Sequence, residues 1–363
     1  MKIQRIETFT QNPLSLVRVT LEDGSQGWGQ IAPFNADIAA QVLHRQIAPH
    51  ALGADASDLD ALSERCIEAN YKFPWSYICR ALAGVDTALW DWRGKQAGQS
   101  VCQLLGGTPR PFPAYGSSMR RDITPQDEAD RLARLQQEHG YNAFKVRVGS
   151  RKGRDQDQWP GRTEELVPAV RRAIGPDASL LVDGNSCYTP ARAIEVGHLL
   201  QDHGGCHFEE PCPYWELEWT AEVAAALDMP VAGGEQDVDL AQWRRMLGMG
   251  AVDIAQPDIC YVGGLTRALE VAQIAQQAGR PVVPHSANHS LVTVFSLHYL
   301  GAVENAGDYL EFSIEPTPWT KGLFTPALVA TDGCVPIPSG PGWGVEIEPA
   351  WLEKAQRQVS EAD

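Results

Sequence analysis

The chain has 363 residues, of which 44% are hydrophobic and 21% are charged, as in ordinary folded proteins and unlike disordered segments. Its net charge of −16 excludes nucleic acid as an expected partner, because an acidic chain repels polyanions. No apolar stretch approaches the ~20 residues that span a bilayer, the N-terminus lacks the apolar centre of a signal peptide, and the cysteines form no CxxC pair. We therefore expect a cytoplasmic protein with reduced thiols that does not contact membranes.

The first segment, residues 1–110, is predicted to form an α+β domain. Residues 1–30 alternate polar and apolar side chains, and Asp23-Gly24 is a hairpin signal between two of these runs. From about residue 36 to 105 apolar residues recur at steps of three and four, as on one face of an amphipathic helix. The sequence thus predicts a small antiparallel sheet followed by helices.

Residues 111–325 alternate short apolar runs with amphipathic helical runs, which is typical of a parallel sheet. Eight strands are predicted, at PAYGSS, AFKVRVG, SLLVDGN, CHFEEP, PVAGGE, VDIAQPD, PVVPHS and YLEFSIE. Eight strands separated by helices are the number in a (β/α)₈ barrel, and the absence of GxGxxG after any of them disfavours a doubly wound dinucleotide-binding sheet. The Pro- and Gly-rich tail, residues 326–363, is predicted to pack back on the N-terminal domain.

Ionisable side chains recur at or near the C-terminal end of successive predicted strands, once in each βα unit. Neighbours in this series are 23 to 27 positions apart: Asp183, Glu209, Glu235, Asp258, His285 and Glu311. In a barrel these strand ends form the mouth, where the chemistry of this fold takes place. We therefore expect the six side chains to converge on one site.

Three members of the series, Asp183, Glu209 and Glu235, are carboxylates on consecutive strands. Converging carboxylates repel one another unless a cation lies among them, and oxygen ligands without His or Cys favour a hard ion, so the sequence predicts a Mg²⁺ site. Because side chains alternate along a strand, Glu210 is expected to face away from Glu209 and to pair with a cation. The competing interpretation is that the acids cap the helices that follow the strands.

The other members of the series predict acid–base chemistry. Asp258 beside His285 would fix the imidazole tautomer and raise its proton affinity, which makes His285 a usable base. On the second barrel strand Lys145 and Arg147 share one face. Arg147 stays protonated and is expected to clamp a carboxylate or polyol. Lys145 is a weaker base candidate than His285, because burial among acids would stabilise its charged form.

The ordered set AFKVRVG, LLVDGN, HFEEP, AGGEQ, IAQPDICYVGG, VVPHSAN and YLEFSIEP resembles the mandelate racemase subgroup of the enolase superfamily, over nearly the whole chain. The resemblance implies a modified (β/α)₇β barrel under a capping domain that the C-terminal tail completes, with loops, here 30–35 and 70–75, that close over the substrate. It also implies Mg²⁺ on the three carboxylates with Asn185 nearby, a His285–Asp258 dyad, Glu311 hydrogen-bonded to the substrate carboxylate or its enediolate, and a homo-oligomer.

Members of the subgroup commonly carry Lys-x-Lys on the second strand, where this chain has Lys145 and Arg147. A racemase needs two opposed bases, so this departure disfavours racemisation. We predict a Mg²⁺-dependent dehydratase of a sugar acid, an aldonate or aldarate, in which His285 removes the proton α to the carboxylate and a metal-stabilised enediolate leads to a 2-keto-3-deoxy acid. The alternatives are a racemase, epimerase or lactone cycloisomerase that uses Lys145 against His285, and a non-catalytic barrel that binds carboxylates.

Overall fold

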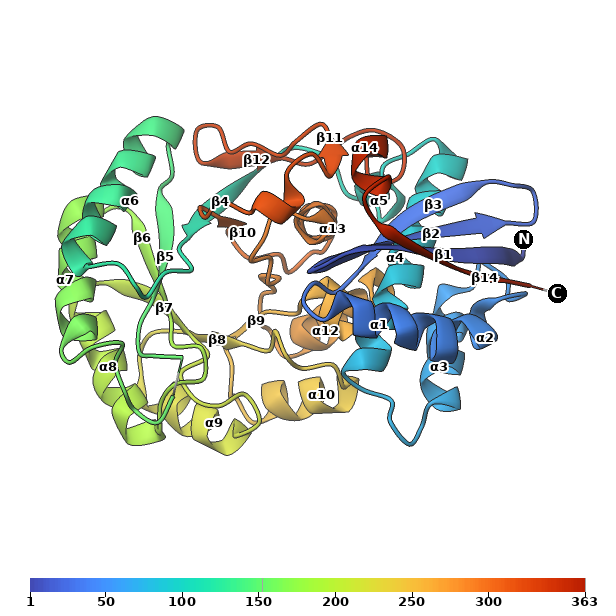
Figure 1. Ribbon diagram of the computed structural model, residues 1–363. Coiled ribbons are helices and arrows are strands. Elements are labelled where there is room, and N and C mark those ends of the chain that lie inside the picture. Colours follow the sequence, from blue (N-terminus) through green and yellow to red (C-terminus); the bar gives the residue numbers. More distant parts are fainter. Residues whose placement is uncertain (152, 363) are drawn as a thin grey trace.

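The computed structural model describes residues 1–151 and 153–362. Figure 1 shows a sheet with helices at one end of the molecule and a set of strands wrapped by helices at the other. Within the described ranges, every helix is too short or too polar to cross a membrane.

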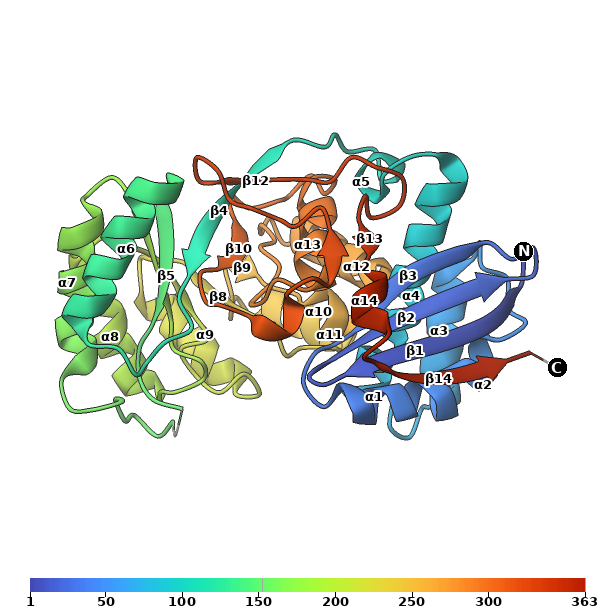
Figure 2. The same cartoon turned by 45° about the horizontal axis from the view of Figure 1, so that its top comes forward.

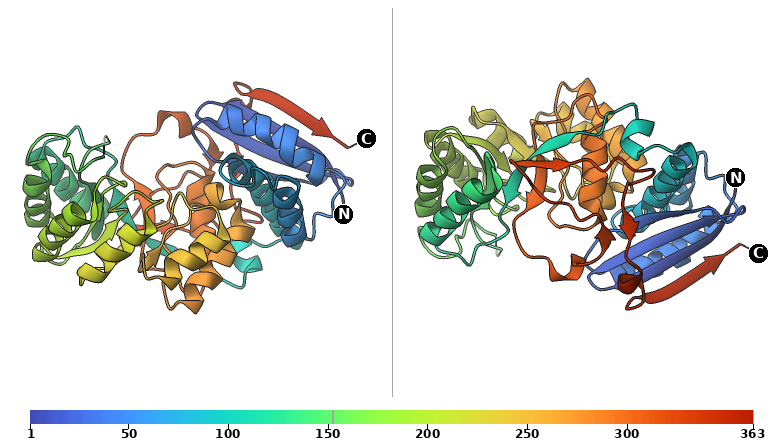
Figure 3. Two further views of the ribbon diagram at one scale, coloured as in Figure 1. Left: turned by 90° about the horizontal axis from the view of Figure 1, so that it is seen from below. Right: turned by 90° about the horizontal axis from the view of Figure 1, so that it is seen from above.

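The N-terminal part is built on an antiparallel sheet with the strand order β14-β1-β2-β3. Its strands are β1 (Ile3–Gln11), β2 (Leu14–Leu21), β3 (Gln26–Ile31) and β14 (Gln356–Glu361). The predicted hairpin at Asp23-Gly24 is confirmed: it joins β2 to β3, and Gly24 has a φ of +84°. Strand β14 pairs antiparallel with β1, and Figure 2 shows it at the edge of the sheet. The views in Figure 3 show the two ends of the chain beside each other, far from the helices drawn in green.

Helices pack against this sheet. They are α1 (Ala36–Val42), a π-helical turn η1 (Leu43–Ile47), α2 (Ala48–Ala51), α3 (Leu59–Ala69), α4 (Tyr77–Ala97) and α5 (Val101–Leu104). Helix α4 approaches β3 so closely that a Cβ atom on Gly29 would lie 2.4 Å from the carbonyl oxygen of Gly84. Glycine at position 29 therefore sets how near the long helix can lie to the sheet.

The second part is a ring of parallel strands in the order β10-β4-β5-β6-β7-β8-β9. The strands are β4 (Pro111–Ser117), β5 (Ala143–Arg147), β6 (Ser179–Asp183), β7 (Gly205–Glu209), β8 (Val231–Gly233), β9 (Ile254–Ala255) and β10 (Leu310–Ser313). The helices that alternate with them are α6 (Pro125–His139), α7 (Arg162–Ile174), α8 (Pro190–Asp202), α9 (Leu217–Ala226), α10 (Leu240–Gly248), α11 (Ile259–Val262), α12 (Leu265–Gln277) and α13 (Leu291–Leu300).

One of the eight predicted barrel strands, PVVPHS, is not a regular strand in the structure. It forms only isolated parallel bridges from Val282, to Ala255 on one side and to Ala306 on the other. Pro281 and Pro284 have no N–H to donate, so this segment cannot form a continuous ladder. The two bridges still join β9 to the chain that leads into β10, so the ring is closed there by single contacts.

The C-terminal tail contacts both parts of the molecule. Its elements are a 3₁₀ turn η2 (Pro318–Thr320), β11 (Phe324–Thr325), β12 (Cys334–Pro336), β13 (Glu346–Ile347) and α14 (Pro349–Leu352). Strand β12 pairs antiparallel with barrel strand β4, whereas β14 joins the N-terminal sheet. The predicted fold class is confirmed: a modified barrel, with an α+β capping domain that the tail completes.

A buried carboxyl group joins the two parts. Asp86 of α4 accepts hydrogen bonds from the backbone N–H and the hydroxyl of Thr266, in the first turn of barrel helix α12. Burial raises the pKa of Asp86 from its usual 3.8 to about 7, although the bonds from Thr266 lower it. A carboxyl group whose pKa is higher in the folded than in the unfolded chain weakens folding as the pH rises between those two values.

Between its usual pKa and about 7, ionisation of Asp86 is therefore expected to lower the free energy of unfolding, by up to about 4 kcal/mol. Asp86→Asn keeps the shape of the side chain without the charge and should remove that part of the pH dependence. Asp177→Asn, at an exposed position, is the matched control. Urea unfolding at about pH 5 and about pH 8 measures the difference, and the same pH dependence in wild type and Asp86→Asn would contradict it.

Candidate active site

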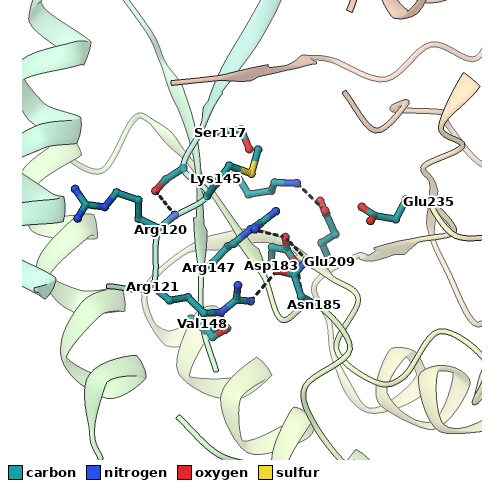
Figure 4. Close-up of polar contacts among 12 residues, drawn as sticks. Ser117, Arg120, Arg121, Lys145, Arg147, Val148, Asp183, Asn185, Glu209 and Glu235 are labelled. Atoms are coloured by element: carbon teal, nitrogen blue, oxygen red, sulfur yellow. Dashed lines mark hydrogen bonds and ion pairs between the residues drawn. The ribbon is translucent and has the colours of Figure 1, made fainter. Parts of the chain in front are cut away.

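Three carboxylates lie where β6, β7 and β8 end. Asp183 and Glu209 are the last residues of β6 and β7, and the two strands pair so that these residues are neighbours in register. Glu235 follows the end of β8 by two positions. In Figure 4 the three side chains point into one space, with Glu235 opposite Glu209. The structure therefore brings the predicted metal-binding residues to one place.

Two cations from β5 enter the same space. Nζ of Lys145 lies 2.6 Å from Oε1 of Glu209 and 2.8 Å from Oε1 of Glu311. Nε of Arg147 lies 3.4 Å from Oδ2 of Asp183, in an ion pair without a hydrogen bond. Burial lowers the pKa of Lys145, but the charges of Glu209 and Glu311 outweigh it and hold that pKa well above its usual value. Lys145 is thus a charged donor in this arrangement.

The three carboxylates are the type of ligand that a hard cation prefers. Burial and the charge of Glu209 raise the pKa of Asp183. The pKa of Glu235 is also raised, by burial and by the charges of Glu209 and Asp183, although His285 lowers it. The three carboxylates therefore repel one another, which an added divalent cation would relieve. In the described chain, no group of three or more acidic, His or Cys side chains lies close enough to hold a metal, and the carboxylates instead face Arg147, Lys145 and His285.

The predicted histidine–aspartate pair is formed. Nδ1 of His285 lies 2.8 Å from Oδ2 of Asp258, and Oδ1 of Asp258 accepts hydrogen bonds from the N–H groups of Cys260 and Tyr261. Asp258 therefore also caps α11, and the cap fixes its orientation. Nε2 of His285 lies 3.3 Å from Oε2 of Glu235. Burial lowers the pKa of His285, but the charge of Glu235 and the hydrogen bond with Asp258 raise it overall, to about 10.

Glu311 completes the ring of ionisable groups, although it is the second residue of β10 and not near its C-terminal end as predicted. One of its oxygens accepts a hydrogen bond from the hydroxyl of Ser117, on the neighbouring strand β4, and also faces Lys145. Its other oxygen accepts a hydrogen bond from the N–H of Ser286, next to His285. Burial raises the pKa of Glu311, but the charges of Lys145 and His285 and the hydrogen bond from Lys145 together lower it below its usual value, so the carboxylate is charged.

The prediction that Glu210 pairs with a cation is wrong. Glu210 follows the last residue of β7 with a φ of +41°, so the strand alternation ends there. Its side chain is buried and lines a small cavity of about 20 Å³, together with Leu217, Met246 and Val252. Its Oε1 has no hydrogen-bond partner, and burial together with the charge of Glu235 raises its pKa well above the usual value. Burial explains the difference, because a carboxyl group in an apolar cavity can remain neutral.

Further polar residues of the site were not predicted from the sequence. Gln256 donates a hydrogen bond to Oε2 of Glu209 at 2.8 Å, from the loop that follows β9. Arg121 donates to the side-chain oxygen of Asn185, which in turn donates to Asp183, and burial lowers the pKa of Arg121 to about 10. Gln256 lies at a strand end, so the rule that found the acids would have found it if extended to uncharged residues. No sequence signal marks Arg121.

The fold and the site together define a class of protein: a barrel whose mouth combines three converging carboxylates, a lysine between two acids and a histidine–aspartate pair. Two family models match the chain. Residues 3–106 match the mandelate racemase/muconate lactonizing enzyme N-terminal domain, and residues 127–351 match the enolase C-terminal domain-like family. The chain therefore belongs to the mandelate racemase/muconate lactonizing enzyme family of the enolase superfamily.

Individual relatives differ in the reaction that their names give. The chain is 28% identical over 358 residues to arabinonate dehydratase of Saccharolobus solfataricus, covering 96% of this chain and 92% of the relative. It is 32% identical over 352 residues to D-galactarolactone cycloisomerase of Agrobacterium fabrum, covering 93% and 90%.

Two solved structures are also similar. A provisionally named racemase from Roseobacter denitrificans is 58% identical over the whole of both chains, with a TM-score of 0.98. A mandelate racemase/muconate lactonizing protein from Paracoccus denitrificans, complexed with magnesium, is 31% identical, with a TM-score of 0.89 and coverage of 98% of this chain and 97% of that one.

Proposed function

We propose that the protein is a Mg²⁺-dependent dehydratase of a sugar acid. The observation that supports this most directly is the site itself: the dyad of His285 and Asp258 faces three carboxylates whose mutual repulsion calls for a cation. The dehydratase name of one relative, and the magnesium in one similar structure, agree with it.

We assign Asp183, Glu209 and Glu235 as the residues that hold the cation. When bound, a divalent cation supplies positive charge that balances these carboxylates and the carboxylate of the substrate. Among the described residues the buried Nε of Arg147 has no hydrogen-bond partner, so its guanidinium is placed to clamp a substrate oxygen beside Asp183.

His285 is the proposed base. The charge of Glu235 raises the pKa of His285, and a cation held by Glu235 would balance that charge. With a proton held on Nδ1 by Asp258, Nε2 would then accept the proton from C2, the carbon α to the carboxylate. The hydroxyl on C3 then leaves with a proton as water. His285 returns its proton to that hydroxyl when both lie on one face of the substrate. Lys145, charged between Glu209 and Glu311, is the donor for the opposite face. The resulting enol becomes a 2-keto-3-deoxy acid.

A lactone cycloisomerase is the second candidate, because a relative with that name is 32% identical to this chain. It would begin with the same proton removal but would retain all atoms of the substrate. Racemisation is less well supported: it needs a second base opposite His285, and the two β5 candidates are a guanidinium and a lysine held in its charged form.

The test is incubation of the protein and Mg²⁺ with a panel of C5 and C6 aldonates, aldarates and their lactones. We expect a 2-keto acid from at least one open-chain acid, detected with a keto-specific reagent. Formation of an isomer without keto acid would assign the cycloisomerase or an epimerase instead. Tight binding without any turnover would assign a non-catalytic carboxylate-binding barrel.

A further inference from the structure

A cation from the capping domain lies next to the site. Arg80 is in the first turn of α4, just after the loop that contains Trp75. Its Nη2 donates a hydrogen bond to the side-chain oxygen of Gln236 at 3.3 Å, and Gln236 donates to Oε1 of Glu235. Its guanidinium carbon lies 3.5 Å from the centre of the ring of Tyr261, which is 5.8 Å from the ring of His285. In space, only Tyr261 thus separates Arg80 from the proposed base His285, and only Gln236 separates it from the proposed metal ligand Glu235.

Arg80 also lacks a partner of opposite charge. Across residues 1–151 and 153–362, its side chain forms no ion pair, and its bond to Gln236 is with a neutral amide. A guanidinium carries five N–H donors in one plane; the ring of Tyr261 covers a face of that plane, and Nη2 donates to Gln236, which leaves further N–H groups along the edge. The side chain is therefore fixed in orientation and has donors to spare.

Arg80 lines a pocket of about 280 Å³ between the capping domain and the loops after β7 and β8. Arg80 is the only cation among the described residues that line it. Two acids also line it. Asp239 already accepts from the N–H of Ala241 and pairs with Arg245, whereas Asp237 is buried. An anion in this pocket would therefore bind the N–H groups of Arg80 that do not donate to Gln236.

We propose that Arg80 binds the second carboxylate of a dicarboxylic sugar acid and so selects aldarates over aldonates. This inference rests on the proposed function, in which the first carboxylate of the substrate lies at the cation that Asp183, Glu209 and Glu235 would hold. A carboxylate matches the planar fork of a guanidinium with two parallel hydrogen bonds, whereas the terminal hydroxyl of an aldonate offers at most one, uncharged, contact. The name of one relative, a galactarolactone cycloisomerase, concerns the lactone of such a diacid.

The experiment measures binding in the absence of turnover. Aldarates and aldonates of the same length and configuration are titrated, with Mg²⁺ present, into His285→Asn protein carrying Arg80, Arg80→Lys or Arg80→Met, and heats of binding give each dissociation constant. Arg93→Met is the matched control, because Arg93 is on the same helix and also stacks on an aromatic ring, Trp90, but lies outside the pocket.

Arg80→Met is expected to weaken aldarate binding by about 10- to 100-fold and aldonate binding by less than about 3-fold, with Arg80→Lys in between. Arg93→Met should change neither. Equal weakening of both acids by Arg80→Met, or no preference for aldarates with Arg80 present, would overturn the inference. If binding follows the expected pattern but the protein with His285 intact forms no keto acid from any substrate, the dehydratase proposal is overturned and the role of Arg80 stands.

Discussion

His285→Asn is expected to lower kcat by about 10²- to 10⁴-fold, the usual contribution of a positioned general base. Asparagine keeps a polar group of similar size next to Asp258 but cannot accept a proton at Nε2. The ion pairs of Lys145 with Glu209 and of Arg147 with Asp183 do not involve the imidazole. We therefore expect Mg²⁺ binding to persist in the variant while keto-acid formation is lost.

The control for this variant is His198→Asn, at an exposed position of α8, which should keep kcat within about twofold. Circular dichroism and a Mg²⁺ titration show whether each variant is folded and loaded. Retention of more than about a tenth of the wild-type kcat by folded, Mg²⁺-loaded His285→Asn would contradict the role of His285 as the base.

Glu209→Gln is expected to weaken Mg²⁺ binding by about 100-fold or more, and to abolish activity at ordinary Mg²⁺ concentrations. The reason is that the affinity of an oxygen site for a hard divalent cation depends on the number of charged ligands. Glu209 is also the acid that holds Lys145 and Gln256, so its loss removes the central contact of the site.

Glu210→Gln is a matched control at the next position. Glu210 is also buried, but its side chain lines a small cavity whose walls include Leu217, Met246 and Val252. Glu210→Gln should therefore change the Mg²⁺ dissociation constant by less than about threefold, because it removes no ligand. Calorimetric titration of both variants with Mg²⁺ is the measurement. Similar affinities for Glu209→Gln and wild type, or a larger loss in Glu210→Gln, would contradict the assignment of the ligands.

The position of the site was predictable because each strand–helix unit of the barrel sets the sequence spacing between successive site residues. One strand and one helix take up nearly constant lengths of chain in this barrel, so acids that recur with that period reach the same edge of the sheet. This was sufficient to locate Asp183, Glu209, Glu235 and the pair of Asp258 with His285. Sequence spacing also identified Lys145 as a residue held by acids, since period-two alternation placed it on the inner face.

The features that were missed depend on burial and on loop geometry, which spacing does not encode. Glu210 was expected to pair with a cation, but its strand ends one residue earlier and its side chain is buried without a partner. The PVVPHS segment was predicted to be a strand, but its prolines cannot donate backbone hydrogen bonds, and it forms only isolated β-bridges. Arg80 and Arg121 come from outside the barrel strands, and only the folded chain brings them beside the mouth.

The most direct measurement follows one hydrogen atom. A sugar acid that the protein converts is labelled with deuterium on the carbon next to the carboxylate, and the product formed in ordinary water with Mg²⁺ is examined by mass spectrometry and NMR. If an imidazole takes that hydrogen as a proton, the keto acid contains no deuterium and the labelled substrate reacts more slowly. Deuterium retained on the adjacent carbon of the product to the same extent, and at the same rate, by wild-type and His285→Asn protein would show that the hydrogen migrates without the imidazole, and would contradict proton removal by His285.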